Sequence, residues 1–368
     1  MKTRIRIMFV IHDMSSGGAE RKVNNIVRHL DSDRFDVHLV LHRMDIAFPL
    51  PEALPTYELG LRHPIQTLKA IRKLRQLIGE TQPDLLVSGA LNPALLCAEA
   101  VRPMAKRPKC VALVANNPQR EPGWRQPWAK RSYRIFDYFI SSCEGLRTIF
   151  LETYSFVRPE QILLWNTPVD IERSVRKAGE PTDKAGSTRA SLIALGRLCE
   201  QKRFDVLLEA FALVRKKQQV DLLILGEGPL RQRLEQQAAA IGVYDSVYMP
   251  GFSANPYPAL NEADVYIMSS DFEGLPNALL EAQALGVPVV TTDCPTGPSD
   301  IIAEGETGLL IECGDPKALA GEVLKLLEDH ELRKKMKEAA RKRVSEHFDV
   351  HVCMPKLEAL LETIAALP

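Results

Sequence analysis

The chain has 368 residues, enough for two domains that each hold a hydrophobic core. Its 47 basic and 47 acidic residues cancel, so it lacks a general polyelectrolyte character and nucleic acid is not expected as a principal partner. The seven cysteines form no Cys-x-x-Cys pair and no zinc-finger spacing with histidine, which favours buried, reduced thiols in a cytosolic protein.

No segment reads as a membrane span. The apolar start at residues 5–11 is too short for a signal peptide and ends in His12 and Asp13, so it predicts a buried first strand. The richest apolar stretch, residues 85–101, is interrupted by polar residues and Pro93, and cannot cross a bilayer. We expect a cytoplasmic protein that is soluble or bound at most to a membrane surface.

Short apolar runs alternate with helical patterns in the first half, which predicts βαβ units and a parallel sheet. We expect helices near 19–30 and 65–80, and strands at 5–11, 37–41, 85–88, 111–115, 138–142 and 161–165. Residues 166–170 begin a crossing segment. Residues 173–189, rich in Lys, Gly, Glu, Asp, Ser and Thr, are typical of a linker or an exposed excursion.

Two loops of this half carry candidate binding residues. Gly17 and Gly18 stand between the first strand and a helix, where glycine lets the backbone approach a phosphate or an acceptor closely, although such a pair alone is usually a turn. Asn116 follows the strand at 111–115. Its amide either binds a sugar or acceptor or caps the loop, and both interpretations stay open.

Basic residues gather in two segments of the same half. Residues 102–109 and 120–134 combine Arg and Lys with Trp124, Trp128 and Tyr133. A basic surface with interfacial aromatic side chains suits a lipid-linked, diphosphate-bearing acceptor at an anionic inner membrane leaflet. Ordinary loop composition explains the pattern nearly as well.

The second half repeats the alternation of strands and helices. Strands are expected at 191–195, 220–225, 246–249, 264–268, 287–291 and 308–311. The charged stretch 331–343 has a helical pattern, and its Lys and Arg residues are typical of a solvated face. The final run, 352–366, is apolar enough to dock against a core.

The first loop of the second half contains two cations. Gly196 and Arg197 follow the strand at 191–195, and Lys202 precedes the amphipathic run 206–216. A strand-to-helix connection lies at the carboxyl edge of a sheet, where open α/β folds bind ligands. A planar Arg fork and a mobile Lys charge would neutralise a diphosphate there. The alternative is a solvated basic loop.

The most informative stretch is residues 271–281, which hold two glutamates separated by seven residues. Glu273 falls in a loop, Pro276 suits the first helical position, and Glu281 lies inside the helix. Eight helical residues span ~12 Å, so Glu273 could meet a sugar at the helix mouth while Glu281 takes ribose hydroxyls. The opening of the helix would offer N–H groups and a positive dipole end to a pyrophosphate, along the residues Gly274, Leu275, Pro276, Asn277 and Ala278.

These motifs occur together in one order: Gly196-Arg197 with Lys202, Gly226-Glu227-Gly228-Pro229, Pro250-Gly251-Phe252, Glu273 with Glu281, and the segment 304–310. In order and spacing the chain resembles glycosyltransferase family 4, the retaining, metal-independent enzymes of GT-B fold, and in particular its bacterial envelope-glycan members. The resemblance is strong over residues 190–330 and looser over the first half.

The resemblance implies an α/β, GT-B fold of two doubly wound, Rossmann-like domains that face each other across a cleft. Residues 1–170 would form an acceptor-binding domain and residues 171–349 a nucleotide-sugar-binding domain, with a C-terminal helix at about 350–368 crossing back to the first. Glu273, Arg197 and Lys202 would be catalytic. Donor binding would use Glu281, the 274–278 segment, Gly196, Gly226 and Glu227, and Gly17, Gly18 and Asn116 would form the acceptor or phosphate loop.

The implied reaction moves a hexose or N-acetylhexosamine from a nucleoside diphosphate sugar, with UDP as the expected nucleotide, to a hydroxyl of a glycan or polyprenyl-diphosphate-linked acceptor. No cofactor beyond this co-substrate is expected. No metal is required either, because no Asp-x-Asp motif lies at a strand end. The chain departs from relatives at Asn116, where they often carry a histidine, and at Asp300, where they carry a glutamate.

Other functions remain open on the sequence. The same donor chemistry could serve a small soluble acceptor, or the chain could be a nucleotide-sugar-binding regulator without turnover, against which its retained site residues speak. Two-carboxylate hydrolysis is disfavoured because Glu281 is assigned to ribose. A dinucleotide-dependent oxidoreductase is weaker still, because no Gly-x-Gly-x-x-Gly follows the first strand.

Overall fold

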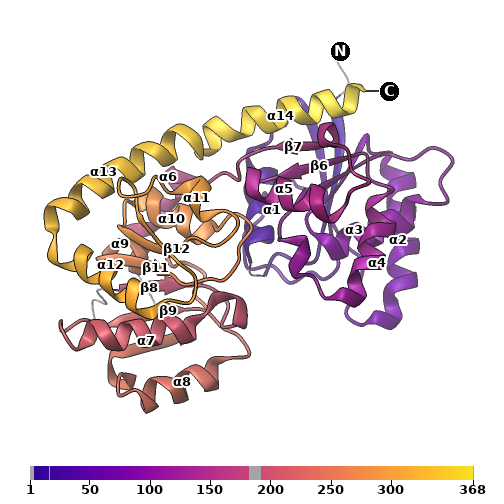
Figure 1. The fold of residues 1–368 in the computed structure, drawn as a ribbon. Coiled ribbons are helices and arrows are strands. Elements are labelled where there is room, and N and C mark those ends of the chain that lie inside the picture. The colour runs from indigo at the N-terminus through magenta and orange to yellow at the C-terminus, as the bar shows by residue number, and fades with distance from the viewer. Residues whose placement is uncertain (1–3, 16, 182–191, 368) are drawn as a thin grey trace. The chain divides into compact units, whose positions relative to one another are not determined.

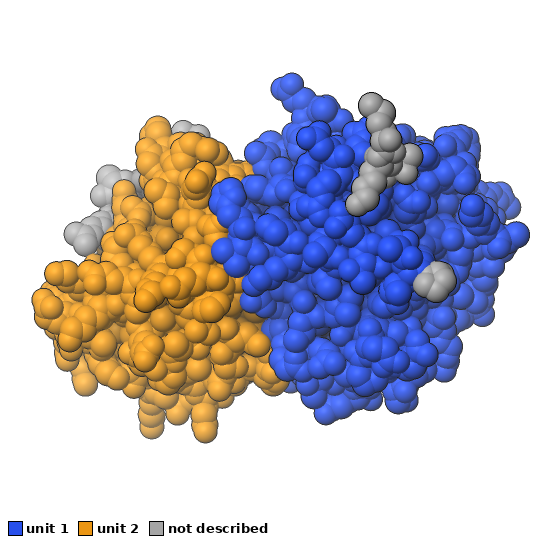
Figure 2. Space-filling view, turned by 90° about the horizontal axis from the view of Figure 1, so that it is seen from above, with its two compact units in different colours: residues 1–168, 350–368 blue, residues 169–349 orange. Residues whose placement is uncertain are grey.

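The computed structural model describes residues 4–15, 17–181 and 192–367. The chain divides into two compact units. Unit 1 comprises Met1–Pro168 and Val350–Pro368, and unit 2 comprises Val169–Asp349. Figure 2 shows the two units in different colours.

Unit 1 is built on a seven-stranded sheet in the order β3-β2-β1-β4-β5-β6-β7, in which neighbouring strands pair in parallel. Parallel strands covered on both faces read as continuous apolar runs, and β1 and β4 are of this kind. The strands are β1 (Ile5–Ile11), β2 (Phe35–Leu41), β3 (Thr56–Glu58), β4 (Leu85–Ser88), β5 (Lys109–Val114), β6 (Tyr138–Ser141) and β7 (Ile162–Leu164).

The helices of unit 1 connect these strands. Helix α2 packs against α3, and α3 against α4, in one layer (Figure 1). The helices are α1 (Gly18–His29), α2 (Thr67–Thr81), α3 (Leu91–Val101), α4 (Gln126–Tyr133) and α5 (Glu144–Thr153), with short 3₁₀ turns η1 (Pro64–Gln66), η2 (Pro118–Arg120), η3 (Gly123–Arg125) and η4 (Pro159–Gln161).

Helix α14 (Val350–Ala366), the last of the chain, belongs to unit 1 and contacts α1. Cys353, Leu357 and Leu361 are buried in the same apolar cluster as β1. The Trp165 ring nitrogen donates to the Cys353 carbonyl at 2.8 Å, and Arg34 pairs with Glu358 at 2.6 Å. The expected return of the C-terminal helix to the first domain is thus confirmed.

Unit 2 is built on a six-stranded sheet in the order β10-β9-β8-β11-β12-β13, again with parallel pairs. Its strands are β8 (Leu192–Leu195), β9 (Leu222–Leu225), β10 (Val247–Gly251), β11 (Val265–Met268), β12 (Val289–Thr292) and β13 (Leu309–Ile311). Its helices are α6 (Ile171–Ala178), α7 (Phe204–Arg215), α8 (Arg231–Ala240), α9 (Tyr257–Glu262), α10 (Asn277–Leu285), α11 (Pro298–Ile301), α12 (Pro316–Glu328) and α13 (His330–His347), with 3₁₀ turns η5 (Glu200–Lys202) and η6 (Tyr244–Ser246).

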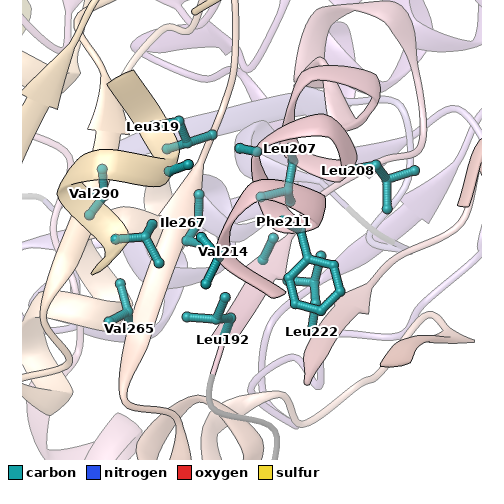
Figure 3. Close-up of a cluster of buried hydrophobic side chains, with 14 of the residues drawn as sticks. Leu192, Leu207, Leu208, Phe211, Val214, Leu222, Val265, Ile267, Val290 and Leu319 are labelled. Atoms are coloured by element: carbon teal, nitrogen blue, oxygen red, sulfur yellow. The ribbon is translucent and has the colours of Figure 1, made fainter. Parts of the chain in front are cut away.

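One face of this sheet carries the main core of unit 2. Helices α7 and α12 pack against each other there, and Phe211 of α7 and Leu319 of α12 are buried with Leu192 and Ile267 of the sheet (Figure 3). Fully burying such side chains stabilises the fold by roughly 1.5–3 kcal/mol each. The core therefore fixes the strands whose carboxyl ends carry the site.

The expected alternation of strands and helices is confirmed in both halves. Strand β3 and helix α6 were not anticipated. Residues 173–178, predicted as a linker, belong to α6, which packs against α9 and α10. The rest of that predicted linker, from residue 182 on, lies outside the described residues.

No helix in the part of the chain that the structure describes combines the length and the hydrophobicity that crossing a bilayer requires.

Loss of α14 is expected to uncover the apolar face of unit 1. A chain ending at Phe348 should lose solubility, and the milder Leu357→Ala should lower the free energy of unfolding by about 2–5 kcal/mol in denaturant titrations. The exposed Lys356→Ala, on the same helix, should change it by less than about 0.5 kcal/mol. Unchanged solubility of the truncated chain would contradict this role of α14.

Candidate active site

The candidate site lies where the order of strands in unit 2 reverses. From β8 the chain builds outward through β9 and β10 on one side, whereas β11, β12 and β13 follow on the other. The carboxyl ends of β8 and β11 are therefore neighbours, although some 70 residues separate them in sequence. Such a reversal is the usual ligand position in open α/β sheets.

The loop after β8 presents the two predicted cations. The stem of Lys202 lies over Gly196, because a Cβ at residue 196 would stand 3.1 Å from Lys202 Cε. Arg197 is exposed, and its guanidinium has no hydrogen-bond or ion-pair partner among the described residues. The loop thus holds one fixed and one available positive charge.

Lys202 and Glu273 form an ion pair across the reversal, with Nζ 2.6 Å from Oε1. Their side chains are only 18% and 8% exposed. Removing both charges from water is costly, and such a pair persists only where its geometry is good and the surrounding groups are satisfied. The structure thus brings together two of the three predicted catalytic residues.

Hydrogen bonds join the two loops that carry this pair. Asp271 N donates to Gln201 O at 3.0 Å, and the Gln201 side chain donates to Phe272 O at 2.8 Å. The Ser269 hydroxyl donates to Lys202 O at 2.8 Å. All three hydrogen bonds end on main-chain carbonyl oxygens, so they fix the backbone of both loops. The ion pair is therefore held by the loops' backbone positions as well as by side-chain packing.

Arg203 is the residue at which the loop turns into α7, and it has a left-handed backbone with φ 47°. This backbone conformation is unfavourable for residues other than glycine. Ion pairs to Asp205 and Asp271, both at 3.1 Å, hold it in place and raise the pKa of its guanidinium. This turn could not be predicted from the sequence, because residue type does not reveal a positive φ at an arginine.

The loop after β12 packs beneath Glu273. The Thr292 hydroxyl donates to Ser270 O at 2.6 Å, and the Thr296 hydroxyl donates to Glu273 O. A Cβ at Gly297 would stand 2.3 Å from Gly274 O, so only glycine allows this approach. Three separate loops therefore determine where the Glu273 carboxylate lies.

The loop after β9 closes the other side of the β8 loop. Gly226 approaches Gly196 so closely that a Cβ would stand 1.8 Å from its carbonyl oxygen. Glu227 is exposed and pairs with Arg231 at 2.7 Å. The predicted donor-binding role of Glu227 therefore has to compete with this surface ion pair.

Helix α10 begins at Asn277, one residue later than predicted, with Pro276 before its first turn. Gly274 and Leu275 are buried, whereas Asn277 and Ala278 are half-exposed at the helix N-terminus. Such an end attracts anions through its N–H groups and dipole.

Glu281 lies deeper in the same helix and is only 3% exposed. Its Oε1 accepts a hydrogen bond from the Tyr257 hydroxyl at 3.1 Å. Burial, and then the charges of Glu273 and Glu281, raise the pKa of Tyr266 on β11, which places both carboxylates near one ring. Sequence reasoning missed Tyr257, because helix α9 carries no motif of its own.

The carboxyl edge of the sheet in unit 1 holds the other predicted residues. Gly17 is the N-cap of α1 with φ 136°, and the Glu20 carboxylate occupies the space where a Cβ at residue 17 would lie. Burial raises the pKa of Glu20 to about 7. Asn116 is exposed, and the loop is capped instead by Asn117, whose side chain accepts from Gln119 N at 2.9 Å.

Lys22 was not anticipated as a site residue, because a lysine on an amphipathic helix is usually exposed. It is 3% exposed, its Nζ lies 3.2 Å from the Ser142 hydroxyl, and the ammonium stands over the Trp165 ring at 5.6 Å. Burial lowers the pKa of Lys22 to about 8. No carboxylate pairs with this ammonium among the described residues, so unit 1 contains a buried charge without an acidic partner.

Tyr133 is a correction to the predicted basic and aromatic surface. Trp124 and Trp128 are exposed, but Tyr133 is buried and packs edge-on against Phe139 and Tyr154. It lies on the inner side of α4, four residues after the buried Ala129, whereas Trp128 lies on the outer side. Tyr133 therefore stabilises the core and does not face a partner.

Within residues 4–15, 17–181 and 192–367, no cluster of three or more His, Cys, Asp or Glu side chains is arranged to hold a metal ion.

Two family profiles match this chain. The profile described as "Glycosyltransferase Family 4" matches residues 16–173, and that described as "Glycosyl transferases group 1" matches residues 180–343. Together they span most of both units.

Two relatives that match nearly the whole chain are also named as glycosyltransferases. The chain is 30% identical over 355 residues to "Lipopolysaccharide core biosynthesis glycosyltransferase LpsD" of Rhizobium meliloti, covering 91% of this chain and 93% of that protein. It is 26% identical over 376 residues to the "N-acetylgalactosamine-N,N'-diacetylbacillosaminyl-diphospho-undecaprenol 4-alpha-N-acetylgalactosaminyltransferase" of Campylobacter jejuni, covering 95% and 98%.

The fold has solved counterparts. Anabaena Alr3699/HepE, solved in complex with UDP-glucose, superposes with a TM-score of 0.83 at 20% sequence identity, covering 98% of this chain and all of that one. At this identity the likeness establishes the fold, which is that of two doubly wound α/β domains.

Gly226→Ala tests the packing of the site loops. Its Cβ would meet the Gly196 carbonyl, and since backbone cannot yield cheaply we expect unfolding free energy to fall by more than about 2 kcal/mol in scanning calorimetry. Gly321→Ala in α12, where a Cβ meets nothing within 4 Å, should instead raise stability by up to about 1 kcal/mol. Equal effects of the two substitutions would refute the close approach.

Lys22→Met tests the buried charge. The folded chain binds the proton of the Lys22 ammonium less tightly than the unfolded chain does. Below pH 8 the lysine is charged in both states, so its burial lowers the free energy of unfolding by the full amount. This destabilisation fades as pH rises towards 10.5. The variant should therefore be more stable than the native chain at pH 7, by up to about 3 kcal/mol, and the difference should shrink at pH 10. Thermal unfolding at both pH values measures this, and a constant difference would count against it.

Proposed function

Because this chain belongs to glycosyltransferase family 4, we propose that it transfers a hexose or N-acetylhexosamine from a UDP-sugar to a hydroxyl of a lipid-linked or envelope glycan, with retention at the anomeric carbon. One observation carries the proposal. The Lys202 ammonium and the Glu273 carboxylate are adjacent at the strand reversal of unit 2, so a diphosphate beside the first would place its attached sugar beside the second.

The departing diphosphate is the group that this site suits best. In the transition state the sugar ring gains positive charge and the leaving phosphate gains negative charge, and stabilising the latter lowers the barrier. Arg197 and Lys202 supply two cations, and the N-terminus of α10 supplies N–H groups beside Asn277 and Ala278. With this charge provided by the protein, we propose that no metal takes part.

Glu273 orients the sugar in this mechanism. The bond from the anomeric carbon to the diphosphate oxygen breaks, the bond to the acceptor oxygen forms on the same face, and the acceptor proton passes to the released phosphate. The proposal therefore needs no further base from the protein. Glu281, which already binds Tyr257, would take a ribose hydroxyl with its remaining oxygen lone pairs.

The relatives support the choice of acceptor. One acts in lipopolysaccharide core biosynthesis, and another, by its name, extends a diphospho-undecaprenol-linked saccharide. We propose the same class here, a glycan on a polyprenyl diphosphate or another envelope glycan, at the inner face of the cytoplasmic membrane. Gly17, Gly18 and Asn116, at the carboxyl edge of the sheet in unit 1, would meet this acceptor.

A thermal-shift panel of nucleoside diphosphates and nucleotide sugars tests the donor class. A ligand at a hundred times its Kd stabilises the folded chain by about 2.7 kcal/mol, and we expect UDP and UDP-sugars to give the largest shifts. Stabilisation by none of the panel would refute the proposed function. Slow hydrolysis of the bound donor without an acceptor would separate an enzyme from a regulator that only binds.

Arg197→Ala and Lys202→Ala should each lower turnover about a hundredfold, because each removes roughly 3 kcal/mol of charge stabilisation from the leaving group. Initial rates with a verified donor and acceptor measure this, with and without EDTA, which should have no effect. Lys217→Ala, exposed beyond the end of α7, is the matched control and should keep full activity. Near-normal turnover of both site variants would remove these residues from the mechanism.

A further inference from the structure

The zero net charge of the chain hides a strong asymmetry. Residues 62–134 contain 14 Lys or Arg and only 4 Asp or Glu, which leaves 33 basic and 43 acidic residues for the rest of the chain. This segment includes helices α2, α3 and α4, which form one layer of unit 1 (Figure 1). Within this segment, Lys69, Arg72 and Lys73 of α2 are exposed on the outer side of the layer.

The same layer exposes large apolar side chains at one end. Ile65 in η1 and Leu68 in the first turn of α2 are 84% and 69% exposed, and Trp124 in η3 and Trp128 in the first turn of α4 are 73% and 60% exposed. Both helices follow parallel strands, so both begin at the carboxyl edge of the sheet. Arg125, next to Trp124, contacts Asn92 in the first turn of α3, which joins the start of α4 to the helix that lies between α2 and α4 in the layer.

Helical spacing places the apolar and basic side chains on the same outer face. On α2, Ala70, Leu74 and Leu77 face the core, while Leu68 and its neighbours Lys69, Arg72 and Lys73 are exposed. None of these three cations forms an ion pair within the described part of the chain, and α2 contains no acidic residue before Glu80. Unpaired cations favour an anionic partner, and exposed apolar side chains favour a partner with an apolar interior.

We propose that this face, the α2–α4 surface, formed by Ile65, Leu68, Trp124 and Trp128 with the basic residues of α2, docks the protein on an anionic phospholipid bilayer. The apolar pair at the start of α2 and the tryptophan pair at the start of α4 lie about two helix spacings, ~20 Å, apart. Both pairs would therefore enter the bilayer interface together. Tryptophan rings occupy the headgroup level of a bilayer, and lysine and arginine reach the lipid phosphates from it. Each such cation contributes about 1 kcal/mol, or roughly fivefold in binding.

This surface deepens the proposed function, because it adjoins the edge of unit 1 at which Gly17 and Asn116 lie. A lipid-linked acceptor held in the bilayer would present its headgroup at that edge. The inference rests on the proposed function only for the identity of the acceptor. Binding to lipid can be measured without any sugar transfer.

The three tryptophans make the test direct, since Trp124 and Trp128 are exposed and Trp165 is buried at 2%. Vesicles of phosphatidylcholine with 30–40% phosphatidylglycerol (about a third anionic lipid) should shift the emission to shorter wavelength, and brominated acyl chains should quench it. Vesicles of phosphatidylcholine alone should do neither. Raising salt well above the physiological range should weaken binding, since the attraction of exposed charges is screened.

Matched variants separate charge from apolar contact in vesicle co-sedimentation. The triple variant Lys69→Gln, Arg72→Gln, Lys73→Gln should bind on the order of a hundredfold more weakly. The pair Trp124→Ser and Trp128→Ser should lose about tenfold or more.

Helix α13 provides the charge control, because it is basic but exposes no large apolar side chain. Replacing its Lys334, Lys335 and Lys337 with Gln should leave vesicle binding within about twofold of the native chain.

The proposal fails if the native chain does not bind anionic vesicles at low salt, if the α13 variant loses as much as the α2 variant, or if bound protein shows no quenching of tryptophan. Binding to polyglutamate but not to vesicles would assign the surface to an acidic protein instead and would also overturn it. If the protein does not bind vesicles but is still stabilised by UDP-sugars, the docking proposal is wrong and the proposed function stands. If the protein binds vesicles but is not stabilised by UDP-sugars, the docking proposal stands and the proposed function is wrong.

Discussion

The adjacency of the carboxyl ends of β8 and β11 is the constraint on which the candidate site depends. It brings a cation and a carboxylate from distant segments to 2.6 Å and keeps both largely out of water. The desolvation of such a pair is offset only when neighbouring groups hold it rigidly. Here the two loops hydrogen-bond to each other through Gln201 and Ser269, and a third loop binds the carbonyl of Glu273. The same rigidity that keeps the pair buried also positions it for a charged, bifunctional ligand.

Glycine determines how closely these loops pack. Gly226 approaches Gly196, and Gly297 approaches Gly274, at distances that leave no room for a Cβ. These contacts join backbone to backbone, so they do not depend on side-chain rotamers. The electrostatics of the site are thus supported by main-chain geometry. At Arg203 the dependence is reversed, because two ion pairs hold the main chain in a conformation that few residues other than glycine adopt.

The distribution of charge links the two proposals. A chain of zero net charge can still distribute its charge unevenly, and residues 62–134 of this one hold 14 Lys or Arg against 4 Asp or Glu. Under the proposed function, docking at a bilayer would bring the protein to a lipid-linked acceptor that is confined to two dimensions. Lys22 shows the opposite placement of charge in the same unit: its ammonium is buried, burial lowers its pKa, and it lies close to the carboxyl ends of β5 and β6.

The sequence by itself determined the alternation of strands and helices, the two doubly wound sheets and the docking of the last helix, because buried parallel strands read as local apolar runs. It also pointed to Lys202 and Glu273 as residues at strand ends, though the roles of the site residues stay predictions. It missed β3, with only three residues, and α6, whose charged sequence resembles a linker until its contacts with α9 and α10 are known. It misplaced Tyr133, since an aromatic residue in a basic segment looks interfacial until the helix face is fixed. The ion pair itself, the turn at Arg203, the bond from Tyr257 to Glu281 and the burial of Lys22 were decided only by tertiary structure, because each depends on which distant strands become neighbours, and local periodicity does not contain that information.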